Sequence, residues 1–167
     1  NVAAINYYFR SKDALLSEAL ETSWNHALDD LRDFLHGTPW DCRKGLGGIA
    51  GYLIEGGAKF PNITRAQLLG LGTGTGTGGP SYVAASMRGI IEETAACVGR
   101  TLGIYPDETL LLRTGSFFAS ILYPAILPAA FPPLRDVDSL ARYERLLVED
   151  YLSTVVRGQA GVTERLA

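Results

Sequence analysis

Residues 1–16 read NVAAINYYFRSKDALL and place two helix starts on either side of an aromatic run. Asn1 is a residue type that caps helix N-termini well, and the small and apolar residues after it suit a short helix. Ser11 can cap a second helix, because its side-chain oxygen can accept from free backbone N–H groups of the first turn. The stretch therefore predicts two helices joined by an aromatic corner at 7–9.

This stretch resembles the recognition helix and following linker of TetR-type transcriptional regulators. The family pattern is a small polar residue, a short variable helix, an aromatic residue, Phe, any residue, Ser or Asp, Lys, an acidic residue, two residues and Leu. The matching positions are Asn1, Tyr8, Phe9, Ser11, Lys12, Asp13 and Leu16. A second interpretation stays open, in which an aromatic run before a capped amphipathic helix is simply a corner that packs in a core.

The resemblance implies a helix-turn-helix DNA-binding head that is incomplete in this chain. Such a head has two further helices before its recognition helix, and the only methionine here is Met87, so we expect upstream residues. We divide the chain into a remnant of the head at 1–10 and a helical ligand-sensing and dimerisation domain at 11–167. Base contacts are expected from Val2, Ala3, Ala4, Asn6 and Tyr7, and phosphate contacts from Tyr8 and Lys12.

Length and charge fit one regulatory body with this fragment attached. A chain of 167 residues can bury a full core. The formal net charge of −3 argues against DNA binding by the body, because binding through counterion release needs clustered Lys and Arg. No apolar run reaches about 18 residues and no charged-then-apolar leader is present, so we expect a cytoplasmic protein without a membrane span.

Neither a metal site nor a disulfide framework is predicted. Cys42 and Cys97 are too few and too unpatterned for either, and we interpret both as reduced thiols. His26 and His36 have no second ligand at metal spacing, which favours solvated or hydrogen-bonded histidines. We therefore expect no cofactor.

Helical periodicity runs through the rest of the chain, with no convincing alternating strand, so the predicted fold class is all-α. The glycines near residues 45–57 indicate either close helix contacts or room for a ligand. The last helix is expected to be capped by Asp136 or Asp138 and to close near Gly158. The earlier helices are predicted over 11–35, 41–59, 62–69, 81–102 and 107–130.

A glycine-rich segment at 70–80 reads GLGTGTGTGGP and superficially suggests a phosphate-binding loop. Such loops follow a strand, lead into a helix and have GxGxxG or GxxxxGK[ST] spacing. Here a helix precedes the segment, no Lys follows it and glycine alternates with threonine. We predict a connector between helices.

Dimer contacts and a ligand pocket follow from the resemblance and from the inward helix faces. In TetR-type regulators the last two long helices pair with their symmetry mates; the alternative is that these stripes form only the core of one chain. The implied dimer contacts are Phe117, Ile121, Tyr143, Leu147 and Tyr151. Candidate pocket residues, each with plain core packing as the alternative, are Trp24, Leu28, Tyr52, Phe60, Met87, Ile91, Thr94, Phe118 and Tyr123.

The implied function is a homodimeric repressor that binds operator DNA and is released by a small apolar or aromatic effector. One alternative is a helical dimerisation or ligand-binding body that does not bind DNA. An enzyme is the least favoured class, because the carboxylate pairs Glu92–Glu93 and Asp29–Asp30 are adjacent and splay to different sides of a helix.

Overall fold

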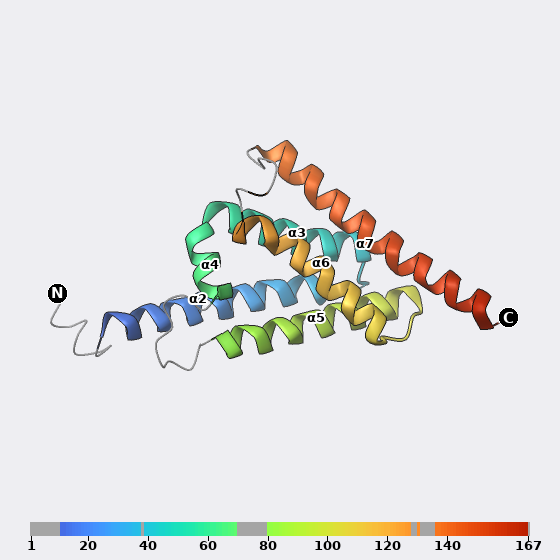
Figure 1. Cartoon of the computed structure of the whole chain (residues 1–167), viewed down its shortest axis with the longest axis horizontal. Coiled ribbons are helices and arrows are strands. Elements are labelled where there is room, and N and C mark those ends of the chain that lie inside the picture. Colours follow the sequence, from blue (N-terminus) through green and yellow to red (C-terminus); the bar gives the residue numbers. More distant parts are fainter. Residues whose placement is uncertain (1–10, 38, 70–79, 128–129, 131–135, 167) are drawn as a thin grey trace.

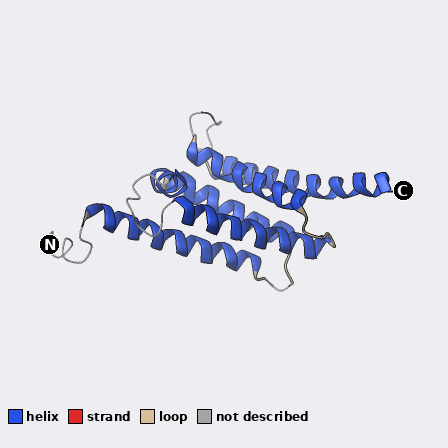
Figure 2. Ribbon diagram, turned by 60° about the horizontal axis from the view of Figure 1, so that its bottom comes forward, coloured by secondary structure: helices blue, strands red, loops and turns tan. Residues whose placement is uncertain are grey.

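The computed structural model describes residues 11–37, 39–69, 80–127, 130 and 136–166. Within these ranges the chain forms α-helices and no strand, as the apolar spacing predicts (Figure 2). The helices are α2 (Lys12–Leu35), α3 (Cys42–Lys59), α4 (Pro61–Leu69), α5 (Pro80–Leu102), α6 (Glu108–Ile126) and α7 (Val137–Leu166).

Short polar side chains begin four of these helices by accepting a hydrogen bond from a backbone N–H in the first turn. The caps expected at Ser11 and Asp41 are confirmed, and of the two candidates for the last helix Asp136 is the cap. The accepted bonds are Ala14 N to Ser11 Oγ at 3.1 Å, Lys44 N to Asp41 Oδ1 at 2.8 Å, Leu110 N to Asp107 Oδ1 at 2.8 Å and Ser139 N to Asp136 Oδ1 at 2.7 Å.

The helices stack in layers, with α2 and α5 side by side and α3 and α6 packed over them (Figure 1). Helix α4 crosses one end of the stack, and α7 packs on the outer side against α3 and α6 (Figure 1). Helix α3 contacts each of the other five described helices, so it is the central element of the body.

The core is formed where the apolar stripes of these helices meet. Helix α2 contributes the buried residues Trp24, Leu28 and Leu31, at the spacing of three and four that predicts an amphipathic helix. The largest side chains with almost no exposure include Leu31, Leu46, Ile49, Ile90, Val98, Phe118 and Ile121.

Glycines of α3 allow close approach by aromatic side chains. A Cβ at Gly45 would overlap the indole of Trp40, and one at Gly48 would overlap the ring of Phe34. Gly56 differs, because a Cβ there would meet nothing within 4 Å. Close contacts are therefore confirmed at Gly45 and Gly48, and Gly56 has open space beside it.

Two helix ends differ from their predicted positions. Helix α6 ends at Ile126 rather than near residue 130, since Leu127 precedes a proline and leaves the helical region at φ −128° and ψ 64°. Helix α7 continues through Gly158 to Leu166, so the prediction that it closes near Gly158 is wrong. At Gly158 the helix continues, and the guanidinium of Arg113 occupies the space that a Cβ would need.

Helix α6 is the described helix that is long and apolar enough to cross a membrane by length and composition alone. The core helix of a soluble protein passes the same test, and Leu110, Phe117 and Phe118 of α6 are buried against neighbouring helices.

Candidate ligand-binding cavity

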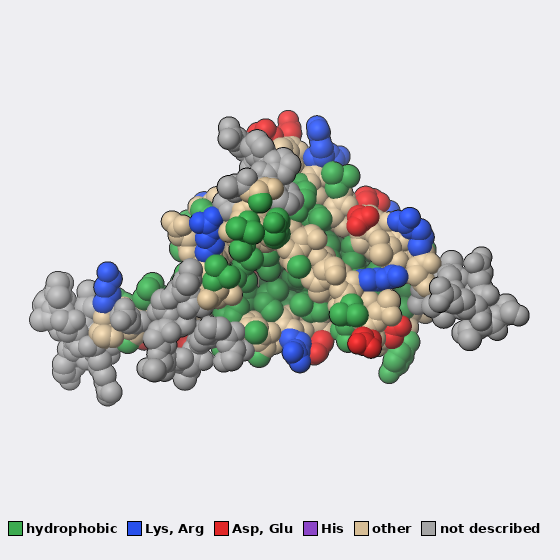
Figure 3. Space-filling view, in the orientation of Figure 1, with side chains coloured by type: hydrophobic (Ala, Val, Ile, Leu, Met, Phe, Trp, Pro, Cys, Tyr) green, Lys and Arg blue, Asp and Glu red, His purple; other side chains and the backbone are tan. Residues whose placement is uncertain are grey.

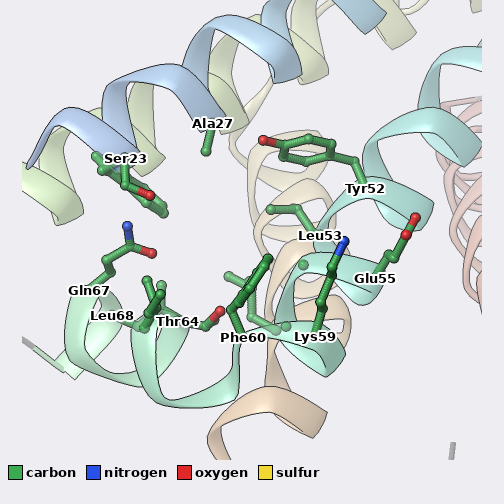
Figure 4. A pocket seen from close by; sticks show the side chains of 15 residues that line it. Ser23, Ala27, Tyr52, Leu53, Glu55, Lys59, Phe60, Thr64, Gln67 and Leu68 are labelled. Carbon is green, nitrogen blue, oxygen red and sulfur yellow. The ribbon is translucent and has the colours of Figure 1, made fainter. Parts of the chain in front are cut away.

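A cavity of about 360 Å³ lies between α2, α3, α4 and α6 (Figure 4). This volume falls within the range of small-molecule sites. Its wall is mostly apolar, and polar side chains approach it from α2, α3 and α4. The lining residues are Ser23, Trp24, Ala27, Tyr52, Leu53, Glu55, Gly56, Gly57, Lys59, Phe60, Ile63, Thr64, Gln67, Leu68 and Leu122.

Two polar side chains of the cavity wall are already hydrogen-bonded within the protein, whereas the hydroxyl groups of Ser23 and Thr64 also line it. Trp24 Nε1 donates to Ser86 Oγ at 2.8 Å, so the indole N–H is satisfied by α5. Gln67 Nε2 donates to the carbonyl oxygen of Leu20 at 3.3 Å, which ties α4 to α2. The inner cavity is therefore suited to an apolar molecule.

Tyr52 lies on the cavity wall facing α2. Its hydroxyl donates to Asp30 Oδ2 at 2.7 Å, and its ring centroid is 6.2 Å from that of Phe34. Burial first, then the hydrogen bond and negative charge of Asp30, raise the pKa of Tyr52 to about 12. The hydroxyl is thus protonated at neutral pH and remains a donor to α2.

A second, more open hollow adjoins the cavity along α2. The two share Ser23 and Tyr52 as lining residues, so these side chains separate them. The second hollow is also lined by Leu15, Glu18, Ala19, Thr22 and His26.

The rim of the cavity has a charged and aromatic edge at the end of α3. Lys59 Nζ lies 5.5 Å from the ring centroid of Phe60, within cation–π range. Glu55, one helical turn earlier, also lines the rim. In Figure 4 the Lys59 amine lies on the cavity side beside Leu53, and the Glu55 carboxylate points away.

The expected pocket residues divide into three groups. Trp24, Tyr52 and Phe60 line the cavity. Leu28, Thr94 and Phe118 are buried in the core instead, and the Thr94 hydroxyl donates to the carbonyl oxygen of Ile90 at 2.7 Å. The partly buried Met87 and Ile91 pack against the core, and Tyr123 is 42% exposed; none of these three is among the lining residues.

Several lining residues were missed because α4 was not considered as a cavity wall. Ile63, Thr64, Gln67 and Leu68 come from this short helix, which buries no residue fully. Their spacing of three and four directly after Phe60 is the signal that could have identified this wall.

The expected dimer contacts form a seam between α6 and α7 of the same chain. Phe117, Ile121 and Tyr151 are buried there, and the Phe117 and Tyr151 ring centroids are 4.9 Å apart. Tyr143 Oη donates to the carbonyl oxygen of Ser120 at 2.6 Å, and Leu147 packs against the core. In this structure the apolar surface of the three buried side chains is therefore used within one chain.

Of the expected DNA contacts, Val2, Ala3, Ala4, Asn6, Tyr7 and Tyr8 lie outside the described residues. Lys12 is the first residue of α2 and is exposed.

Cys42 and Cys97 are buried free thiols, and the described part of the chain holds no group of three His, Cys, Asp or Glu side chains arranged to bind a metal.

No protein-family model matches the chain, and neither the curated proteins nor the solved structures give a significant match.

Proposed function

We propose that the chain is the body of a cytoplasmic TetR-type transcriptional regulator, with residues 1–10 as the remnant of its DNA-binding head. The body senses a small apolar ligand, and the homodimer releases operator DNA when the ligand binds. The observation that carries the proposal is the mostly apolar cavity, which is bordered by α2, the helix that follows residues 1–10 in the sequence.

The position of α2 makes it the connection between ligand and head. Ser23, Trp24 and Ala27 of this helix line the cavity. Ser11 caps the helix and directly follows residues 1–10 in the sequence. Shifting a two-state population from 1:99 to 99:1 requires a difference in ligand affinity of about 5.5 kcal/mol between the states. At about 0.8 kcal/mol per buried CH₂, a difference of roughly seven buried methylenes is sufficient.

Dimerisation is supported by the outward faces of α6 and α7. Leu112 of α6 is 66% exposed and Leu146 of α7 is 62% exposed, and Ala119 and Tyr123 extend the α6 stripe at helical spacing. Figure 3 shows hydrophobic side chains in the middle of the face that α6 crosses. We therefore place the partner contacts at these outward residues instead of the buried Phe117, Ile121 and Tyr151.

Selection of duplexes from a random DNA library by the intact protein tests this function. We expect inverted repeats whose half-sites are separated by one helical turn or a multiple of it, because a two-fold dimer presents two heads. Failure to select any sequence, with a dimer still present by sedimentation, would contradict DNA binding and support the alternative of a ligand-binding body.

Lys12→Ala supplies a further readout in the same experiment. Loss of a phosphate contact should weaken binding to all duplexes alike. Lys44→Ala is the matched control, because Lys44 is also exposed and also lies in the first turn of a helix, but that helix is α3 and does not follow residues 1–10. An effect of Lys12→Ala on one operator alone would contradict the phosphate role.

A further inference from the structure

We propose that the cavity binds a small apolar monocarboxylate, with the carboxylate at Lys59 and the apolar part between Trp24 and Phe60. This inference rests on the proposed function, since it names the chemical class of the effector. It also narrows the sequence-based expectation of a small apolar or aromatic effector.

The size of the ligand follows from the cavity volume. A cavity of about 360 Å³ lies near the lower end of the range of small-molecule sites, which fits a ligand of about a dozen non-hydrogen atoms. A ten-carbon carboxylic acid has this size. Larger molecules would have to extend past Ser23 and Tyr52 into the adjoining hollow.

The inner wall restricts where a charged group can lie. The indole N–H of Trp24, the hydroxyl of Tyr52 and the amide N–H of Gln67 are all engaged with protein acceptors. A charge buried beside them would lose its hydration without gaining an ionic partner, which is strongly unfavourable. Among the lining residues only Lys59 carries a positive charge, so a carboxylate finds its counter-charge there, at the rim.

Lys59 provides the positive charge at that rim. The ion pairs among the described residues are Arg32–Asp29, Arg32–Glu93 and Arg43–Glu149, so the Lys59 ammonium is not neutralised by any of them. The Phe60 ring lies next to the Lys59 ammonium, and Figure 4 places this group toward the cavity and the Glu55 carboxylate away from it. Glu55 and Lys59 both line this rim, and Lys59, beside the Phe60 ring, is the cation that we assign to the carboxylate.

Titration calorimetry with decanoate, decanol and decylamine at pH 7.5 tests the assignment, because the three probes share one alkyl chain. The informative quantity is the ratio of decanoate affinity to decanol affinity, which removes the contribution of the chain. We expect this ratio to fall about fivefold in Lys59→Gln, as for an ion pair at an exposed rim, and to be restored in Lys59→Arg. Glu55→Gln is the matched control on the same rim and should not lower the ratio.

Three results would overturn the inference in different ways. If Lys59→Gln leaves the ratio unchanged while decanol still binds, the carboxylate is not held by Lys59, and the sensor function stands. If decylamine binds most tightly and Glu55→Gln weakens it, the cavity takes a cation. If none of the three probes binds, the cavity is no site for a ligand of this size and shape, and the proposed sensing function fails with it.

Discussion

Replacing Gly56 by leucine is expected to fill the cavity and to leave the fold intact. Gly56 lines the cavity, and a Cβ there would meet nothing within 4 Å, so the new side chain enters open space. A leucine side chain has four carbon atoms, which displace about four methylenes of a bound ligand. At about 0.8 kcal/mol per CH₂ this weakens binding by about 3 kcal/mol, or roughly a hundredfold.

The stability of the same variant should rise. Leucine is a better helix former than glycine by about 0.8 kcal/mol in a helix interior. For a chain of this size that gain raises Tm by about 2–3 °C. The combination of higher Tm and lost binding separates a filled cavity from a damaged fold.

Binding of decanol can be followed through the fluorescence of Trp24, which lines the cavity, with calorimetry as a second readout. Gly89→Leu is the matched control, because Gly89 is also inside a helix, also has open space at its Cβ and does not line the cavity. It should gain stability and keep decanol binding. Wild-type decanol affinity in Gly56→Leu would refute the location of the site, and a lower Tm would refute the open space at Gly56.

The remaining predictions concern α7 and the buried thiols. Burial raises the pKa of Glu144, so the stability that its protonated carboxyl group contributes is fully present below the unfolded pKa and is lost as pH rises through the folded pKa. Glu144→Gln should therefore raise Tm at pH 7 and not at pH 4 in thermal melts. An equal change in Tm at both pH values would contradict this. Burial raises the pKa of Tyr151 to about 12, although its hydrogen bond to Thr114 acts in the lowering direction. The unfolding free energy should therefore fall between pH 10 and 12, less steeply in Tyr151→Phe. That variant also loses the 2.7 Å hydrogen bond to Thr114 Oγ1, which should cost about 1 kcal/mol in urea unfolding; no loss would contradict a contribution from this bond. Cys42 and Cys97 should react with a thiol reagent only after denaturant is added, since both are buried and burial raises the Cys42 pKa, and fast native labelling would refute their placement.

Local patterns in the sequence predict the helices well, because their causes lie within a few residues. Ser11 and Asp41 cap helices where expected, and the left-handed φ of 68° at Gly103 follows the predicted end of α5. The same glycine rule fails at Gly158, where the helix continues and the Arg113 guanidinium from another helix lies against the glycine. Contacts of this kind connect distant parts of the chain and leave no periodic signal.

The candidate site could be predicted only in part for the same reason. Trp24, Tyr52 and Phe60 were identified from inward helix faces, but an inward residue is as often core as cavity wall. Thr94 and Phe118 have the same pattern and pack fully in the core. The position of α4 decides which inward residues line the cavity and which lie in the core. That position follows from the packing of α4 against its neighbours, including α2 and α6, rather than from its own nine residues.

Helix α3 contacts the cavity, the helix α2 that leads to the proposed DNA-binding head, and the helix α7 that carries proposed dimer contacts. Its C-terminal turn carries Lys59 at the rim, and its N-terminal turn carries Arg43, which pairs with Glu149 of α7. Between these two turns, Gly47 and Gly51 lie against the Glu144 carboxylate of α7. A Cβ added at Gly47 would lie 3.1 Å from Glu144 Oε1, and one added at Gly51 would lie 3.2 Å from Oε2. Under the proposed function, a ligand that displaces the end of α3 would act on α2 through Tyr52 and Asp30, and on α7 through the contacts of Gly47 and Gly51 with Glu144.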